Sequence, residues 1–314
     1  MFFAILTTII WSGNFIVARA VYQDIPPIAL CFFRWSLAAI LFFPFAIRTF
    51  VREWPLIRRH LPYFFWLALS GIALFNTFIY VAGHYTSAIN LALIGTTSSP
   101  VMAIIMARIF LKEKVGWQKI LGMLICLTGI LFLICKGNLR NLATLEFSKG
   151  DAWVLLAAFS FAVYNVLVKK KPVAISPTGF LFTAILFGAV MLIPLALLEG
   201  RNATPIAWSW NLAAVLLYLG LGASIISYLL WNKSIQLLGA GPTALFGNLI
   251  PIFSSLEAVF ILHEKFTVQH VISMVIVFTG LLIANLSLFN NPKTRDSIQE
   301  PQNHEGTKGH EGIH

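Results

Sequence analysis

Four hydroxyl residues and a proline interrupt an apolar run in the segment GTTSSP, which begins at Gly95. The ring of Pro100 removes one amide donor and crowds the carbonyl group of Thr96, four residues earlier. That carbonyl, together with the hydroxyls of Thr96, Thr97 and Ser98, offers hydrogen-bonding groups to a small polar molecule. The sequence therefore predicts a helix break and part of a binding site at this point.

A second proline lies in a similar run later in the chain. Pro251 follows the amide side chain of Asn248, and we expect it to break a helix and free the carbonyl of Gly247 in the same way. The side chain of Asn248 is the second polar group that we assign to the binding site.

Two charged residues lie deep within apolar runs, Arg34 and Glu257. Ionisable groups are costly in such places and therefore point to function. We predict that the two form an ion pair that belongs to a gate, or that Arg34 anchors a carboxylate. A permanent structural ion pair is the alternative.

Other polar and aromatic side chains occur at similar depth, and converging polar groups among aromatic walls are typical of a small-molecule site. The alternative is that these groups only join helices through hydrogen bonds. The predicted substrate-binding residues in this set are Trp11, Asn14, Asn76, Tyr80, Tyr164, Ser227, Tyr228 and Trp231.

Two motifs suggest catalysis, and neither is persuasive. Ser224 and the later His263 resemble an intramembrane serine hydrolase pair only faintly, because no glycine follows the serine. The segment HEGIH at 310–314 matches H-E-x-x-H but contains glycine and ends the given sequence, so it is a poor zinc-binding helix. We expect no catalytic residue, no metal and no cofactor.

The elements that must position these residues are apolar helices. The chain is 58% hydrophobic and 11% charged, against about 25% charged residues in soluble domains. A span of the bilayer needs roughly 20 apolar residues. The all-α membrane fold that we predict has ten such segments, at 2–22, 27–47, 62–82, 88–110, 116–135, 150–168, 177–198, 210–232, 241–262 and 268–289.

The net charge of +10 does not indicate nucleic-acid binding, because the basic residues occupy alternate connections instead of one patch. Their positions predict a multi-pass protein of the plasma (inner) membrane, with both termini cytoplasmic and the lipid bilayer as its surroundings.

The chain contains an internal repeat. A shift of 151 residues places Pro100 on Pro251, while Glu113 falls on Glu264. We predict a first five-helix repeat at 1–136, a linker at 137–149, a second repeat at 150–289 and a disordered cytoplasmic tail at 290–314. Because five is odd, the two repeats have opposite orientations in the membrane, an architecture that suits transporters.

The paired P-x12-E-K elements, the aromatic and small residues of the first segment of each repeat, and Arg34 resemble the EamA-like branch of the drug/metabolite transporter superfamily. The resemblance covers roughly residues 2–288 and implies a ten-helix transporter with a central cavity. Ala184 takes the place of Arg34 in the second repeat, and Met106 that of Glu257 in the first, so any role of these charges is asymmetric.

The resemblance implies a secondary transporter that exports small polar metabolites, first of all amino acids, by alternating access. A nucleotide-sugar or drug transporter of the same superfamily is the alternative, although Arg34 is the only deep basic group for an anionic ligand. An intramembrane hydrolase is a remote third alternative. Proton antiport, exchange and uncoupled transport all remain open, as does the oligomeric state.

Overall fold

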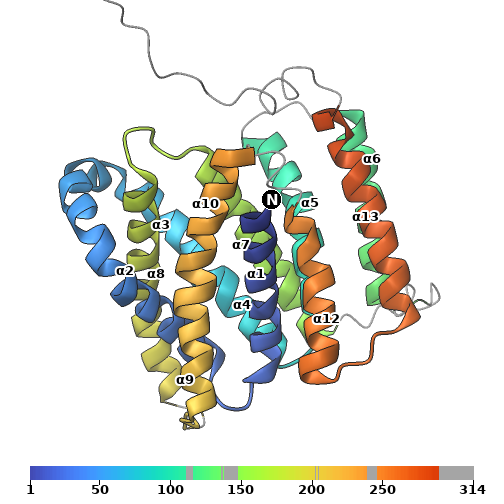
Figure 1. Ribbon diagram of the computed structural model, residues 1–314, viewed down its shortest axis with the longest axis horizontal. Helices are drawn as coiled ribbons and strands as arrows, with labels where there is room; N and C mark the ends of the chain where they lie inside the picture. Colours follow the sequence, from blue (N-terminus) through green and yellow to red (C-terminus); the bar gives the residue numbers. More distant parts are fainter. Residues whose placement is uncertain are drawn as a thin grey trace, which may run out of the picture.

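The computed structural model describes residues 1–110, 116–135, 137, 148–201, 203, 205–238 and 246–289, and these residues form helices and no strand. Figure 1 shows the helices packed side by side. Most of the predicted linker and all of the predicted tail at 290–314 lie outside the described residues.

The helices of the first half are α1 (Phe2–Ala20), α2 (Pro27–Ile57), the 3-10 turn η1 (Arg58–His60), α3 (Leu61–Ala68), the π-helix η2 (Leu69–Leu74), α4 (Phe75–Gly83), α5 (Ala88–Phe110) and α6 (Trp117–Ile134). Those of the second half are α7 (Lys149–Lys169), α8 (Pro177–Gly200), α9 (Trp210–Leu217), the π-helix η4 (Tyr218–Ile226), α10 (Ser227–Leu238), the 3-10 turn η5 (Gly247–Leu249), α12 (Ile250–Leu262) and α13 (Val268–Phe289). Helix α2 extends well beyond the predicted end at residue 47.

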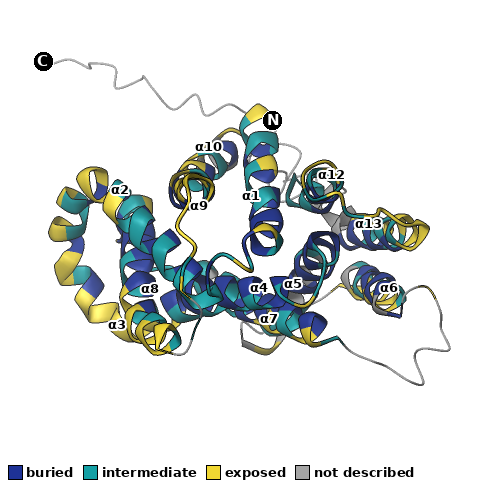
Figure 2. Cartoon of the chain, turned by 90° about the horizontal axis from the view of Figure 1, so that it is seen from below, coloured by how far each residue is buried: buried dark blue, intermediate teal, exposed yellow. Residues whose placement is uncertain are grey.

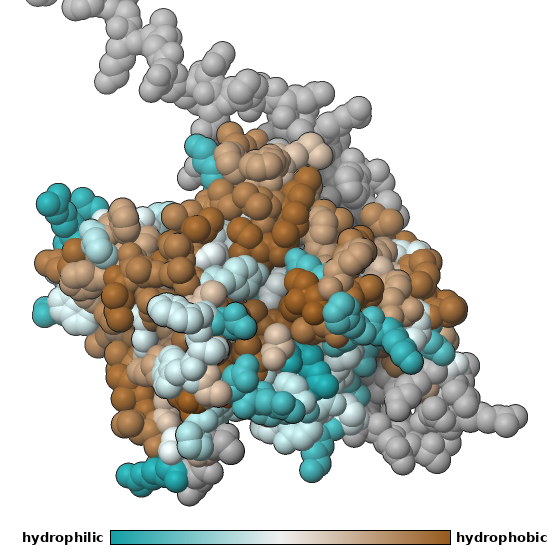
Figure 3. All heavy atoms as spheres, turned by 60° about the horizontal axis from the view of Figure 1, so that its bottom comes forward, coloured by the Kyte–Doolittle hydropathy of each residue, from teal (hydrophilic) through white to brown (hydrophobic). Residues whose placement is uncertain are grey.

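Among the described residues, five helical stretches are long and apolar enough to cross a membrane, and one of them, Pro27–Gly83, includes α2 to α4. Three shorter apolar helices lie in α6, α12 and α13. Figure 3 shows broad hydrophobic surfaces on the flanks of the molecule and polar residues gathered toward the end that faces the viewer. Exposed apolar side chains such as Phe45, Leu197 and Phe260 suit contact with lipid.

The helix contacts of the two halves correspond. Helix α5 packs against α7 as α12 packs against α1, and α4 packs against α7 as α10 packs against α1. In the same way η2 contacts α8 and η4 contacts α2, while α2 and α8 pair with each other and α6 pairs with α13. Figures 1 and 2 show the α6–α13 pair at one edge of the molecule and the α2–α8 pair toward the other.

A π-helical segment interrupts the third element of each half. The range of η2, moved by 151 residues, falls on 220–225, inside η4. π-helical turns are rare and frequently occur at functional sites. Both halves therefore have the same local irregularity beside the paired helices α2 and α8.

Carboxylates stabilise both ends of the α2–α8 pair. The backbone N–H groups of Ile28 and Ala29 donate to the two oxygens of Glu199 at 3.1 and 2.8 Å. At the opposite end, Ser176 donates to Glu53 Oε2 from its N–H and its hydroxyl, both at 3.1 Å. Negative charge is favourable at a helix N-terminus, because the first N–H groups there have no partner within the helix.

The predicted helix break at Pro100 is wrong, because α5 continues as an α-helix from Ala88 to Phe110. Near Pro251 the helix does change: η5 is a 3-10 turn, and Pro251 occupies the first turn of α12. The Gly247 carbonyl is not free as predicted, since the N–H of Ile250 donates to it. The tighter 3-10 bond satisfies the carbonyl before the proline is reached.

Candidate functional site

Arg34 lies at the centre of a polar cluster that joins four helices. Its Nε donates to Ser224 Oγ at 2.9 Å, and one terminal nitrogen lies 2.6 Å from Asn14 Oδ1, 2.9 Å from Asn76 Oδ1 and 2.8 Å from the Tyr80 hydroxyl. These residues come from α1, α2, α4 and η4, so both halves of the chain contribute.

The partners of this cation are all neutral. Arg34 is only 4% exposed, and its guanidinium also lies 4.8 Å from the centre of the Trp35 ring. In the described part of the chain, no carboxylate lies within 4.0 Å of it. A guanidinium buried among neutral dipoles is a favourable place for an anionic group to bind.

The predicted ion pair between Arg34 and Glu257 is not formed in this structure. The partners of Arg34 are Ser224 at Nε and Asn14, Asn76 and Tyr80 at one terminal nitrogen. Glu257 instead contacts Ser12 of α1, with 2.7 Å between Ser12 Oγ and Glu257 Oε1.

Aromatic side chains gather between α1 and α10. The ring centre of Trp11 lies 5.5 Å from that of Tyr228 and 5.1 Å from that of Trp231, and its Nε1 donates to the carbonyl of Ala223 at 3.1 Å. Tyr164 of α7 interacts with Tyr228 and is buried. Four of the predicted site residues thus form a second, aromatic cluster.

The remaining predicted residues make local contacts or are only partly described. The hydroxyl of Ser227, the first residue of α10, donates to the carbonyl of Gly222 in η4, and that of Thr96 donates to the carbonyl of Ala92 within α5. The hydroxyl of Ser98 is buried without a partner among the described residues. The side chains of Thr97, Pro100 and Asn248 lie outside the description.

Sequence reasoning assigned Ser224 to a different role. The residue hydrogen-bonds Arg34, and no hydrogen bond joins it to His263 among the described residues. Ser224 lies in η4, two residues after Gly222. Because Gly222 is the repeat partner of Gly71, the repeat is the signal that could have pointed to Ser224 as a site residue.

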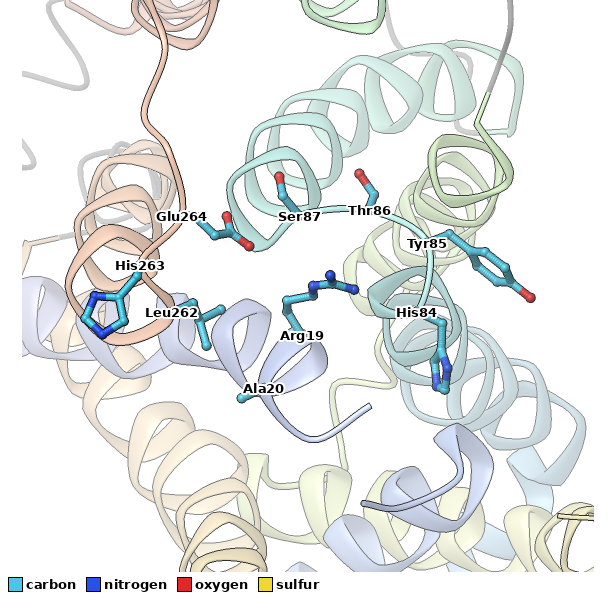
Figure 4. Close-up of a pocket in the computed structure, with 9 residues that line it drawn as sticks. All are labelled: Arg19, Ala20, His84, Tyr85, Thr86, Ser87, Leu262, His263 and Glu264. Atoms are coloured by element: carbon cyan, nitrogen blue, oxygen red, sulfur yellow. The ribbon is translucent and has the colours of Figure 1, made fainter. Parts of the chain in front are cut away.

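A polar cavity of about 500 Å³ lies at one end of α1, where it meets the ends of α4 and α12 and the start of α5 (Figure 4). Arg19, His84, His263 and Glu264 are among the residues that line it. Arg19 donates to the Gly83 carbonyl at 3.0 Å, and Glu264 accepts from the first N–H groups of α5. This end carries the polar surface seen in Figure 3.

Relatives cover almost the whole chain. An uncharacterized transporter of Archaeoglobus fulgidus is 28% identical over 88% of this chain and 94% of its own length. A second uncharacterized transporter, YyaM of Bacillus subtilis, is 27% identical over 88% of this chain and 90% of its own length. A protein of Escherichia coli named "Probable amino-acid metabolite efflux pump" is 25% identical over 89% of this chain and 92% of its own length.

A solved crystal structure shares the fold, with a TM-score of 0.61 at 15% identity over 91% of this chain and 97% of the other. The model of the EamA-like transporter family matches twice, at residues 1–135 and 148–286, which together include every helix of the Arg34 cluster. The chain belongs to the EamA-like transporter family.

Proposed function

We propose that this protein is a secondary transporter of the inner membrane that exports small polar metabolites, with amino acids as the first substrates to test. The observation that carries the proposal is the Arg34 cluster. A buried guanidinium that has only neutral partners, between segments from both halves of the chain, can receive the carboxylate that every amino acid has. The name of the Escherichia coli relative agrees with this substrate class.

The aromatic cluster supplies the second part of the proposed site. Trp11, Tyr228 and Trp231 extend from the same stretch of α1 and α10 that borders the Arg34 cluster, since Trp11 donates to Ala223, the neighbour of Ser224. Small-molecule sites combine a few polar anchors with aromatic walls. We propose that Arg34 and its partners hold the carboxylate while this cluster contacts the rest of the substrate.

Alternating access is proposed from the two-fold correspondence of the chain. The family model matches twice, and the helix contacts of one half recur in the other. If the halves are inverted with respect to each other, an exchange of their conformations opens the site first to one side of the membrane and then to the other. The repeats 1–136 and 150–289 would be the units that exchange.

Efflux from liposomes tests the proposal. Liposomes that contain the purified full-length chain are loaded with a mixture of labelled amino acids, and the efflux of each is compared between the native chain, Arg34→Gln and Arg201→Gln. Arg201 is an exposed residue at the end of α8, so it provides a matched loss of charge outside the cluster. We expect selective efflux that Arg34→Gln abolishes and Arg201→Gln retains.

The same experiment distinguishes the alternatives. Efflux of nucleotide sugars or hydrophobic drugs in place of amino acids would contradict the proposed substrate class. Equal amino-acid efflux by native protein and Arg34→Gln would show that the carboxylate does not bind at Arg34. Thermal unfolding of each variant establishes that a loss of efflux is not a loss of folding.

A further inference from the structure

Ser12 and Glu257 have an arrangement that depends on a proton. Ser12 Oγ lies 2.6 Å from the carbonyl oxygen of Ile9 and 2.7 Å from Glu257 Oε1. A hydroxyl has one hydrogen to donate. If Glu257 were ionised, both neighbours of Ser12 would be acceptors, and one of the two short contacts would bring two oxygens together without a hydrogen between them.

A protonated Glu257 satisfies both contacts. The carboxyl group then donates its hydrogen from Oε1 to Ser12 Oγ, and the hydroxyl of Ser12 donates to Ile9. Contacts of 2.6 and 2.7 Å are normal for O–H···O hydrogen bonds, whereas two unshared acceptors repel at that separation.

The other carboxyl oxygen supports the same protonation state. Glu257 Oε2 is buried and has no hydrogen-bond partner among the described residues. An ionised carboxylate with one oxygen left bare in an apolar span is far more costly than a neutral carboxyl group in the same place. No lysine, arginine or histidine of the described part of the chain lies within 4.0 Å of Glu257 to offset the charge.

The charged and titratable groups around α12 do not change this balance. Helix α1 has a single charged or titratable side chain, Arg19, which donates to the carbonyl of Gly83, and η5 has no such side chain. The only one in α5 is Arg108, whose side chain lies outside the description. In η4 the hydroxyl of Tyr218 donates to the Ile10 carbonyl, and Arg34 is held by its own cluster.

We propose that Glu257 is the proton-binding site through which this transporter couples substrate export to the proton gradient, an inference that rests on the proposed function. Glu257 carries a proton in the conformation seen here. When the contact with Ser12 opens during transport, the O–H bond breaks, the proton passes to water and a carboxylate remains. Rebinding of a proton from water reverses the step.

In this proposal, the water that exchanges the proton comes from the polar cavity of Figure 4. Leu262, which lines that cavity, is five residues further along α12, or about 7.5 Å at 1.5 Å per residue. A cavity of about 500 Å³ is large enough to hold many water molecules.

Infrared spectroscopy tests the protonation directly. We expect the full-length protein at neutral pH to show the carbonyl band of a protonated carboxylic acid, to lose it in Glu257→Gln, and to keep it in the matched control Glu264→Gln. Ser12→Ala, which removes the acceptor and keeps the carboxyl group, should shift the band. Absence of the band from the native protein, or its persistence in Glu257→Gln, would overturn the proposal.

A transport experiment tests the coupling. In liposomes, a pH gradient should accelerate export by the native protein at least tenfold, and Glu257→Gln should lose this acceleration while it retains exchange of labelled for unlabelled substrate. An unchanged response to the gradient in the variant overturns the inference. Because the infrared band needs no substrate, a native protein that shows it without exporting any amino acid contradicts the proposed function alone. Export without the band contradicts this inference alone.

Discussion

At the scale of single residues, Arg34 is the group to which we propose that the substrate carboxylate binds. Its guanidinium reaches Ser224 through Nε, while a terminal nitrogen points to Asn14, Asn76 and Tyr80. The Nε–H and the two hydrogens of that terminal nitrogen lie in the fixed plane of the guanidinium, and a lysine ammonium on its flexible stem cannot reproduce this arrangement.

We therefore predict that Arg34→Lys lowers the rate of substrate efflux about tenfold or more, although the charge is kept. The loss of one hydrogen bond to a charged group costs about 1.5–3 kcal/mol, and 1.4 kcal/mol corresponds to a factor of ten. The measurement is initial efflux from liposomes at equal amounts of protein. A lysine variant as active as the native protein would mean that charge alone is required.

His84 lies just after α4, in the polar cavity, where partial burial and, to a smaller extent, the nearby Arg19 cation lower its pKa below the ordinary 6.5. The folded state thus binds this proton less readily than the unfolded state does, so stability is lost as the pH falls through about 6.5. We predict that Tm falls between pH 7 and pH 5 by more in the native protein than in His84→Gln. Parallel profiles for the two proteins would contradict the prediction.

At the scale of elements, the outer pair α6 and α13 depends on glycine. A methyl group at Gly122 would collide with the Gly280 carbonyl, and one at Gly280 would collide with Gly122 and Cys126. Small residues allow two membrane helices to approach closely, because their packing replaces the hydrophobic effect that drives association in water.

We predict that Gly122→Ala or Gly280→Ala lowers stability by about 1–3 kcal/mol, the usual cost of overpacking. Gly200→Ala at the end of α8 is the matched control, since a methyl group there meets no atom within 4 Å. Thermal unfolding in detergent measures the difference. Equal unfolding temperatures for the three variants would show that the pair can separate without cost.

The helices also show which features of the fold could be predicted from the sequence. Apolar length and the repeat at 151 residues correctly predicted a helical chain whose two halves match the same family model. The prolines were misleading: a membrane helix can continue through Pro100, and a 3-10 bond can satisfy Gly247. The sequence correctly predicted that Arg34 and Glu257 lie inside apolar helices, which are α2 and α12. It could not predict their partners, because rotation about the helix axis and neutral groups on other helices decide those contacts.

At the scale of the whole molecule, the inversion that we propose for the two halves makes a prediction that depends on no substrate. His60 ends the turn between α2 and α3, and the corresponding connection of the second half lies between α8 and α9, where Trp210 is the first residue of α9. Both positions are exposed, Trp210 to 91%. Parallel halves would place the two turns on the same side of the membrane, and inverted halves would place them on opposite sides.

We predict that in intact cells a membrane-impermeant maleimide labels Trp210→Cys and leaves His60→Cys unlabelled, and that both react once the membrane is opened. The native thiols Cys31, Cys126 and Cys135 are buried, so the background should be low. Labelling of His60→Cys alone in intact cells would keep the inverted halves and reverse the predicted cytoplasmic termini. Labelling of both variants from outside would contradict the inversion itself, and with it the exchange of conformations that we propose for alternating access.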